Sequence, residues 1–312
     1  VYPETEHNYL NNQNQIYTYT KKGAEALKLT FSAKSYTENN SDFIYVLDGN
    51  GYCVARLSGS IGGKTMVTAG DTVQLYFSSD GNSAYYGFSF DSIDEAPLND
   101  ATHPIDTWRI SENKIYADGS SNLSIMKNRD VFAHLTEVEV TEGTTSLPAN
   151  MMEGMANITE VTLPEGITNI GNSAFKDCKG LTEIEIPDTV TTIGDRAFYN
   201  CVGITKLDLT KNITSIGTYA FGYCTGLKSV FIPANLKSAN VAYTIDSLNS
   251  DKAYGIFNGC INLSDVTFEE GTDYIRAGLF AGSGLKTLDI PDTVTEIGKH
   301  AFNKCEALES VT

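Results

Sequence analysis

Apolar and polar residues alternate along the first part of the chain, and this pattern predicts β-strands. The stretch 27–31 reads Leu-Lys-Leu-Thr-Phe and the stretch 73–77 reads Val-Gln-Leu-Tyr-Phe, with every second side chain apolar. Between such stretches, Asp-Gly-Asn-Gly at 48–51 is typical of a hairpin turn. Residues 1–93 are therefore predicted to form a small antiparallel β-sandwich, with one face of each sheet buried.

The second part of the chain repeats one pattern, most plainly as Ile-Gly-x-x-Ala-Phe-x-x-Cys. The phenylalanine recurs at Phe175, Phe198 and Phe221 in steps of 23 residues, and seven copies fall between residues 152 and 302. A period of about 20 to 29 residues is typical of leucine-rich solenoids. Residues 135–312 are therefore predicted to form stacked coils, which present a long surface suited to binding.

One copy, Leu-Thr-Glu-Ile-Glu-Ile-Pro at 181–187, shows how each coil is expected to fold. Alternation places Ile184 and Ile186 inside the coil and the two glutamates outside, which predicts a short strand ended by proline. The phenylalanine and cysteine of the motif are three residues apart, which predicts a short helical or 3-10 stretch on the opposite wall. A single coil buries too little apolar surface to fold alone, so the coils are expected to stack cooperatively.

Two segments, predicted to be a linker and a cap, lie between the β-sandwich and the coils. Residues 94–105 lack periodicity and carry turn-forming residues, so they are predicted to be a linker. Residues 106–134 contain the only tryptophan, Trp108, among several aliphatic residues, and we expect them to cap the first coil rather than to stack a ligand on Trp108. The predicted fold class is mainly β with short helices, an N-terminal β-sandwich followed by a solenoid.

One repeat is longer than the others. The step from Phe221 to Phe257 is 36 residues, and the extra residues lie near 237–252. Tyr243 and its apolar neighbours make this segment too apolar for an ordinary flexible loop. We expect it either to pack on the solenoid or contact a partner through Tyr243, or to be an insertion without function, since long surface loops cost little stability.

The charge of the chain narrows the range of partners. With 39 acidic and 22 basic residues the formal net charge is −17, which disfavours nucleic acid because phosphate contacts need cations. No apolar run approaches the roughly 18 residues that span a bilayer. The chain opens without the basic and apolar segments of an export signal and stops within an expected repeat, so we interpret it as a trimmed ectodomain.

Candidate catalytic groups are scarce in the sequence. The four histidines, His7, His103, His134 and His300, lie outside any catalytic or metal-binding motif. There is no nucleophile motif and no glycine loop of the kind that binds phosphate. The sequence therefore predicts a binding protein and not an enzyme.

The six cysteines are expected to be free, buried thiols. Cys53 is the only cysteine of the first part, and the other five share one position of the repeat. Side chains on neighbouring coils lie about 4.8 Å apart or farther, whereas a disulfide needs Cβ atoms within roughly 3.5 to 4.5 Å. Cysteines in one such row do not converge on a metal ion either.

The repeat resembles the BspA-type, or treponemal-type, leucine-rich repeat of bacterial surface proteins. The resemblance is carried by the nonapeptides that begin at Ile170, Ile193, Ile216 and Ile297. It implies a right-handed solenoid over residues 135–312 and an extracellular location, either secreted or attached to the cell surface. It also implies adhesion to host or microbial ligands.

Residues 8–93 resemble bacterial CUB-like modules. The resemblance is carried by Ser-Asp-Phe-Ile-Tyr-Val-Leu-Asp-Gly at 41–49 and by Tyr-Gly-Phe-Ser-Phe at 86–90. Some members of that family bind calcium, and no other cofactor is expected. The resemblance places the calcium ligands on Glu38, Asp42 and Asp80.

The two aspartates of this set also allow a second interpretation. Asp42 and Asp80 lie in segments where an aspartate often caps a turn by accepting hydrogen bonds from backbone amides. Both interpretations stay open from the sequence alone.

The outward strand positions of the coils form an acidic stripe. A concave face of this kind would attract a cationic peptide or metal ions, and Phe231 is an outward aromatic that is a candidate anchor. The alternative is a solvated face whose charge only prevents aggregation. The predicted ligand-contact residues are Glu137, Glu139, Glu160, Glu183, Glu185, Asp208, Phe231, Asp265 and Asp289, with Tyr243 on the insertion.

Two functions are consistent with these features. The first is adhesin-like binding of a host or microbial surface protein, by a monomer, through the acidic stripe and the insertion. The second is a carbohydrate-binding accessory module of a larger secreted protein, in which tyrosines stack on the sugar rings of a glycan. Tyr36, Tyr85 and Tyr86 discriminate between them. A groove lined by these rings favours sugars, whereas their burial in the core favours protein binding.

Overall fold

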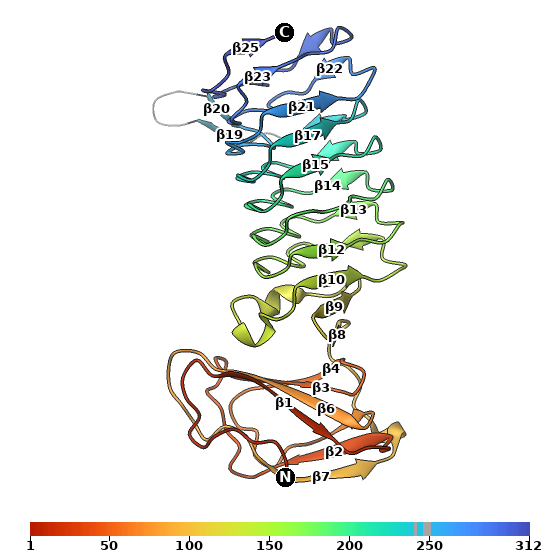
Figure 1. Ribbon diagram of the computed structural model, residues 1–312, viewed down its shortest axis with the longest axis vertical. Helices are drawn as coiled ribbons and strands as arrows, with labels where there is room; N and C mark the ends of the chain where they lie inside the picture. Colours follow the sequence, from red (N-terminus) through yellow and green to blue (C-terminus); the bar gives the residue numbers. More distant parts are fainter. Residues whose placement is uncertain (240–241, 246–250) are drawn as a thin grey trace. The chain divides into compact units, whose positions relative to one another are not determined.

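The computed structural model describes residues 1–239, 242–245 and 251–312, and of residues 238–239, 242–245 and 251–254 the backbone only. The chain divides into two compact units, Val1–Tyr116 with Arg129–Leu135, and Ala117–Asn128 with Thr136–Thr312. The regular secondary structure of both units is mainly β-strand (Figure 1). Helix in the described residues is limited to the 3-10 segments η1 (Leu98–Asp100), η2 (Leu123–Met126) and η3 (Asp130–Phe132). The prediction of a mainly β fold is confirmed. No described helix is long and apolar enough to cross a bilayer.

Two antiparallel sheets, of order β1-β6-β3-β4 and β5-β2-β7, enclose one apolar core in the first unit. Leu27, Leu29 and Phe31 lie in this core and are fully buried, whereas Lys28 is exposed. The alternation therefore correctly predicted antiparallel strands with one buried face. The strands are β1 (Asn14–Thr20), β2 (Ala26–Phe31), β3 (Phe43–Leu47), β4 (Cys53–Leu57), β5 (Thr65–Ala69), β6 (Thr72–Ser78) and β7 (Phe90–Ala96).

The first unit extends past the boundary expected at residue 93. Strand β7 continues to Ala96, which pairs with Ala26 of β2. Strands β8 (Arg109–Ser111) and β9 (Lys114–Ala117) then form an antiparallel hairpin, and Arg109 makes a β-bridge with Tyr52. Backbone pairing therefore ties part of the expected linker and cap to the first unit.

Ring contacts place a second part of the expected cap in the first unit. The ring of Phe132 in η3 packs on Tyr45 and Tyr76, with centroid distances of 4.9 and 5.5 Å. Trp108 is fully buried, so its ring offers no face to a ligand from solvent. The segment expected to cap the solenoid thus contributes residues to both units.

The coils of the second unit form two walls of parallel strands (Figure 1). Val138 pairs with Val161 in the first wall, and Ile170 pairs with Ile193 in the second, so equivalent repeat positions lie beside each other. The predicted solenoid of stacked coils is confirmed. The first wall contains β10 (Glu137–Val140), β12 (Glu160–Thr162), β15 (Lys206–Asp208), β17 (Ser229–Ile232), β21 (Asp265–Phe268), β23 (Thr287–Leu288) and β25 (Ser310–Val311). The second contains β11 (Ser146–Leu147), β13 (Asn169–Ile170), β14 (Thr192–Ile193), β16 (Ser215–Ile216), β18 (Ser238–Ala239), β22 (Tyr274–Ile275) and β24 (Glu296–Ile297).

The Ala-Phe-x-x-Cys stretch forms turns, so the prediction of a helical segment there was wrong. The amide of Phe175 donates to the carbonyl of Ala197 in the next coil at 2.8 Å, and the amide of Phe198 donates in the same way to Ala220 at 2.7 Å. Asp177 has a φ of 61°, which lies outside the right-handed helical region. Because these amides bond to the neighbouring coil, they are not available to close a helical turn.

The phenylalanines of the motif stack along the inside of the second unit. Ring centroids are 4.8 Å apart between Phe175 and Phe198 and 5.1 Å apart between Phe198 and Phe221, with nearly parallel planes. Beside them the cysteines are free thiols, all buried except the half-buried Cys305. Each repeat thiol donates to a carbonyl of the preceding coil, as Cys201 does to Phe175 at 3.0 Å. The row of sulfurs is therefore satisfied by the backbone.

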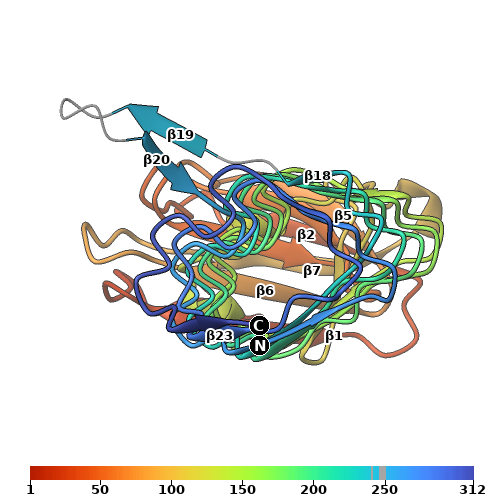
Figure 2. The same ribbon diagram turned by 90° about the horizontal axis from the view of Figure 1, so that it is seen from above.

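The long repeat keeps its place in the stack. Ser238 of β18 pairs with Ser215 of β16 in the same register as the other coils. The extra residues include β19 (Ala242–Ile245) and β20 (Asp251–Tyr254), which form an antiparallel hairpin that stands out from the coils in Figure 2. Residues 240–241 and 246–250 of the predicted insertion, and the side chain of Tyr243, lie outside the described residues.

Candidate functional site

The outward side chains of the first wall form one continuous surface, which we call the acidic face. Alternation along each strand creates it: in β12, Glu160 and Thr162 are exposed on either side of the buried Val161. Parallel pairing in register repeats this arrangement from coil to coil. The acidic face comprises Glu137, Glu139, Glu160, Glu183, Glu185, Asp208, Phe231, Asp265 and Asp289, which are exposed or half-buried.

Lys206 is the single basic side chain at the outward strand positions of the acidic face, and it is held by a neighbouring aspartate. Lys206 Nζ lies 2.5 Å from Asp208 Oδ2, and this hydrogen bond raises the pKa of Lys206. Lys206 is therefore paired with the aspartate of its own strand. Phe231 lies in register between Asp208 and Thr267 and is half-buried, so part of its ring is accessible beside a carboxylate.

The first wall is interrupted in the middle of the acidic face. The segment predicted to be a strand at 181–187 keeps its inward and outward alternation, with Ile184 and Ile186 buried, but it is not a strand. The amide of Thr182 still reaches the carbonyl of Thr159 at 3.5 Å. Among the described residues, no backbone hydrogen bond joins Glu183–Ile186 to either neighbouring coil.

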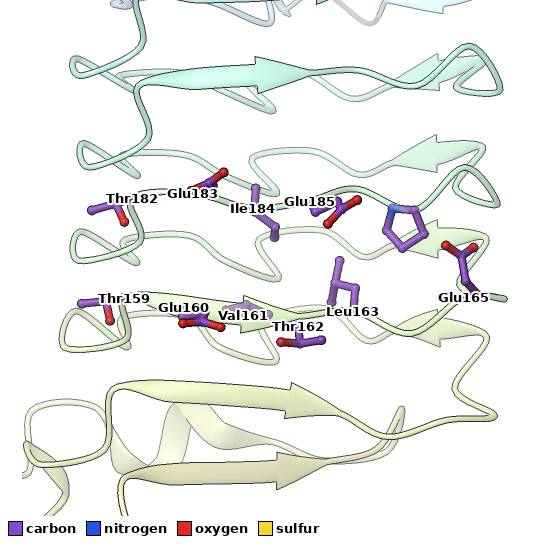
Figure 3. Close-up of a pocket in the computed structure, with 11 residues that line it drawn as sticks. Thr159, Glu160, Val161, Thr162, Leu163, Glu165, Thr182, Glu183, Ile184 and Glu185 are labelled. Carbon is purple, nitrogen blue, oxygen red and sulfur yellow. The ribbon is translucent and has the colours of Figure 1, made fainter.

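Like charges would face each other across this interruption. A continuous register would set Glu183 opposite Glu160 and Glu185 opposite Asp208, and like charges directly opposite each other destabilise strand pairing. The separated coils leave two openings, of about 580 Å³ towards β12 and about 640 Å³ towards β15. Figure 3 shows Glu160, Glu183 and Glu185 around the first opening, with a strand drawn at Glu160 but not at Glu183.

In the first unit, the structure brings together the three predicted calcium ligands. One carboxylate oxygen from each of Glu38, Asp42 and Asp80 lies within 4.8 Å of the other two. Asp42 is fully buried immediately before β3, and Asp80 follows the end of β6. We call this group the carboxylate cluster. Among the described residues, it is the only set of three potential metal ligands that converge in this way.

The hydrogen bonds of the carboxylate cluster support both interpretations of its aspartates. Asp42 Oδ1 accepts from the amide of Asp80 at 2.8 Å, and Asp80 Oδ1 accepts from the amide of Asn82 at 2.8 Å, as turn caps do. Glu38 Oε2, however, is shielded from solvent and has no hydrogen-bond partner. An orphaned carboxylate oxygen beside two more carboxylates fits a hard cation, which prefers oxygen ligands.

The electrostatics of the carboxylate cluster point the same way. Burial raises the pKa of Asp42, and desolvation followed by the charges of Asp80 and Asp42 raises the pKa of Glu38. Tyr9 donates its hydroxyl to Asp42 Oδ2, and its own pKa is raised by burial and by this bond. The sequence analysis missed Tyr9, because no local pattern links it to Asp42.

The three tyrosines that discriminate between sugar and protein binding lie at the surface of the first unit. Tyr36 and Tyr85 are 39% and 38% exposed, and their ring centroids are 5.1 Å apart. The half-buried Tyr86 stacks on His7 with centroids 4.0 Å apart, a contact that the sequence analysis did not foresee. These rings are therefore not part of the apolar core.

Comparisons with known proteins bear on the repeats. The family model of the BspA type leucine rich repeat region matches residues 145–253 and 244–312 in six copies, which is more than half of the chain. No curated protein matches the chain. Three solved structures are similar to it: a leucine-rich repeat protein of T. pallidum (19% identity, 61% of this chain and 89% of that one, TM-score 0.41), one of Bacteroides ovatus (16%, 66% and 69%, 0.39), and a leucine-rich cell surface protein of Faecalibacterium prausnitzii (21%, 64% and 72%, 0.31).

Proposed function

Because this chain belongs to the BspA-type leucine-rich repeat family, we propose that it is a non-catalytic adhesin-like protein that binds host or microbial surface proteins outside the cell, secreted or attached to the cell surface. The observation that carries this proposal is the acidic face, where exposed carboxylates and one accessible aromatic ring lie on a stacked strand scaffold. Binding surfaces of repeat proteins are typically extended arrays of this kind.

The acidic face supplies both attraction and an anchor. Its carboxylates favour a partner with a basic patch, and such charge complementarity raises the rate of encounter and selects among partners. Phe231 adds apolar area that a partner can bury, and aromatic residues near the centre of an interface contribute much of its free energy of binding. A partner contacting both would gain orientation from the charges and affinity from the ring.

Replacing Phe231 with alanine is expected to weaken binding of a protein ligand by about tenfold or more, in line with the loss of an interface hot spot. Ligands are first identified by capture from panels of purified host matrix and microbial surface proteins, and affinities are then measured by surface plasmon resonance. The matched control is Ile261→Ala, which truncates a 65% exposed apolar side chain of the same unit off the acidic face. Equal effects of the two substitutions, or binding that is insensitive to salt, would contradict the proposal.

A second candidate function is favoured by one observation, the exposed Tyr36 and Tyr85 pair. Two adjacent tyrosine rings at a surface can stack on sugar rings. A glycan array with the wild-type chain and the Tyr36→Ala variant tests this function. Binding to glycans that Tyr36→Ala abolishes, together with no captured protein, would replace adhesion to proteins by carbohydrate recognition.

We also propose that the carboxylate cluster holds calcium in the first unit. Glu38, Asp42 and Asp80 would supply carboxylate oxygens, and the ion would neutralise charge that burial otherwise destabilises. Such an ion would tie the segment before β3 to the turn after β6.

A further inference from the structure

The interruption of the first wall exposes backbone groups that a continuous sheet would pair. The amides and carbonyls of Glu183, Ile184 and Glu185 make no backbone hydrogen bond with either neighbouring coil. On both sides of this segment the neighbouring coils do form strands, β12 and β15. The middle of the acidic face is therefore a place where donors and acceptors are available to a ligand, and Glu183–Glu185 is unpaired with the coils on both of its sides.

The side chains around the two openings specify the charge of that ligand. Glu160, Glu183 and Glu185 line the first opening, and Glu183, Glu185 and Asp208 line the second. Lys206 is the only basic residue that lines either opening, and Asp208 already holds it. A cation placed here would reduce the repulsion among these carboxylates.

The geometry favours cationic side chains over a metal ion. Within the described residues, the carboxylate oxygens of the acidic face do not converge as a group of three, in contrast to those of the carboxylate cluster. A guanidinium or ammonium group is larger than a metal ion and carries several N–H donors, so it can bridge carboxylates that lie farther apart. The hydroxyl oxygen of Thr210, which lines the second opening, is shielded from solvent and lacks a hydrogen-bond partner, so it offers a further acceptor.

The two openings also set a spacing. They lie on opposite sides of Glu183–Glu185, so they are offset by one coil, a step of about 4.8 Å in a paired sheet. In an extended peptide, side chains at alternate positions are roughly 6.6 Å apart on the same face. An extended segment that runs along the solenoid can thus present alternate side chains to both openings.

We propose that the interrupted wall between β12 and β15 is a binding subsite for an extended basic segment of a partner protein, with two arginine or lysine side chains at alternate positions entering the two openings beside Glu183 and Glu185. This inference rests on the proposed function and names the chemistry that the acidic face recognises. The carboxylates bind the cationic groups, and the unpaired carbonyls of Glu183–Glu185 accept hydrogen bonds from the same side chains.

Peptides of one composition test the proposed spacing. Isothermal titration calorimetry of the full chain would compare a peptide containing Arg-Ser-Arg with one containing Arg-Arg-Ser and with one in which glutamate replaces arginine. The peptide with arginines at alternate positions, Arg-Ser-Arg, which we call the alternate peptide, is expected to bind at least about fivefold more tightly than the peptide with adjacent arginines. The glutamate peptide is expected not to bind. Equal affinity for the two arginine peptides would overturn the proposal, because it would show general charge attraction only.

Substitutions on the acidic face test the place of binding. Glu183→Gln and Glu185→Gln are each expected to lower the affinity for the alternate peptide about tenfold or more, as for loss of a hydrogen bond between charged groups. Asp265→Asn removes the same charge from β21, a paired strand of the acidic face, and is expected to change affinity less than about twofold. Equal losses in all three variants would overturn the proposal.

Two further arms separate the alternatives. In the first, calcium alone is titrated into the Asp80→Asn variant, which lacks one ligand of the carboxylate cluster, and no calcium binding is expected at the acidic face. Calcium binding that is lost when Glu183→Gln is added to this variant would identify a metal site instead. If protein ligands lose affinity in Phe231→Ala but not in Glu183→Gln, the proposed function stands and the basic subsite fails. If the peptide binds as expected but no protein is captured, the subsite stands and adhesion fails.

Hydrogen exchange followed by mass spectrometry would report on the interruption itself. The amides of Glu183, Ile184 and Glu185 are expected to exchange at least tenfold faster than those of Leu207 in β15 or Val230 in β17, because only the latter lie in paired strands. The alternate arginine peptide should slow exchange at Glu183–Glu185 and leave the paired strands unchanged. Slow exchange in the free protein, or no slowing by bound peptide, would contradict the subsite.

Discussion

Replacing Phe198 with alanine is expected to lower the free energy of unfolding of the second unit by about 3 to 5 kcal/mol. The side chain is fully buried, and its ring is stacked between those of Phe175 and Phe221 with centroid distances of 4.8 and 5.1 Å. Truncation would leave a cavity between two rings that are held in place by their own coils, so the site cannot collapse around it. Urea unfolding followed by far-ultraviolet circular dichroism measures the loss.

The same stack supplies a matched control for this prediction. Phe302 occupies the same repeat position but is half-buried, and among the described rings it stacks on Phe280 only, with centroids 5.8 Å apart. Phe302→Ala is therefore expected to cost less than half as much as Phe198→Ala. A loss below about 1 kcal/mol for Phe198→Ala, or equal losses for the two variants, would show that the stack does not hold the coils together.

Calcium in excess is expected to raise the melting temperature of the first unit, and chelator to lower it again. A ligand that binds only the folded state at a hundredfold excess over its Kd stabilises that state by about 2.7 kcal/mol. The ion would satisfy Glu38 Oε2, which is otherwise buried without a partner, and would offset the repulsion among the three carboxylates. Differential scanning calorimetry with calcium and then with excess chelator measures the effect.

The response to calcium should depend on pH. Burial raises the pKa of Asp42 above its ordinary value near 4, and Glu38 shifts in the same direction. Without calcium, the stability that these groups contribute is present below the ordinary pKa and is lost as pH rises through the raised pKa, because the folded state favours the protonated form. Calcium needs the ionised carboxylates, so its stabilising effect should be small near pH 4 and should grow as pH rises above the raised pKa values.

Two variants locate the calcium effect. Asp80→Asn removes one carboxylate of the carboxylate cluster and should abolish most of the calcium response. Asp94→Asn removes an exposed carboxylate of β7 and should leave the response intact. An unchanged melting temperature in excess chelator, or a response that Asp80→Asn leaves intact, would remove the proposed ion and leave the two aspartates as turn caps.

The boundaries of the first unit illustrate a limit of sequence reasoning. The segment 94–105 lacks periodicity, yet β7 runs into it, and η3 packs on the outer side of the sandwich sheet through Phe132. Periodicity reports which side chains are buried within an element, but it does not report which element buries them. Long-range contacts such as those of Phe132 therefore escape a pattern that is read locally.

The carboxylate cluster shows the same limit in a binding site. The CUB-like resemblance named its three carboxylates, and the structure brings them within 4.8 Å of one another. Tyr9, whose hydroxyl bonds Asp42, lies in an irregular stretch far from all three in the sequence. Only the pairing of β6 with both β1 and β3 brings these segments together.

The sequence by itself determined that this chain has a strand-rich first part and a solenoid of coils, because the two-residue alternation and the 23-residue step each require one kind of burial. It also determined which carboxylates face outward, since a strand has only two sides. Only the tertiary structure decided that the amide of Phe198 bonds to the next coil instead of closing a helical turn. It also decided that Glu183–Glu185 pairs with neither neighbouring coil. Both outcomes depend on hydrogen bonds between neighbouring coils, which no single repeat contains.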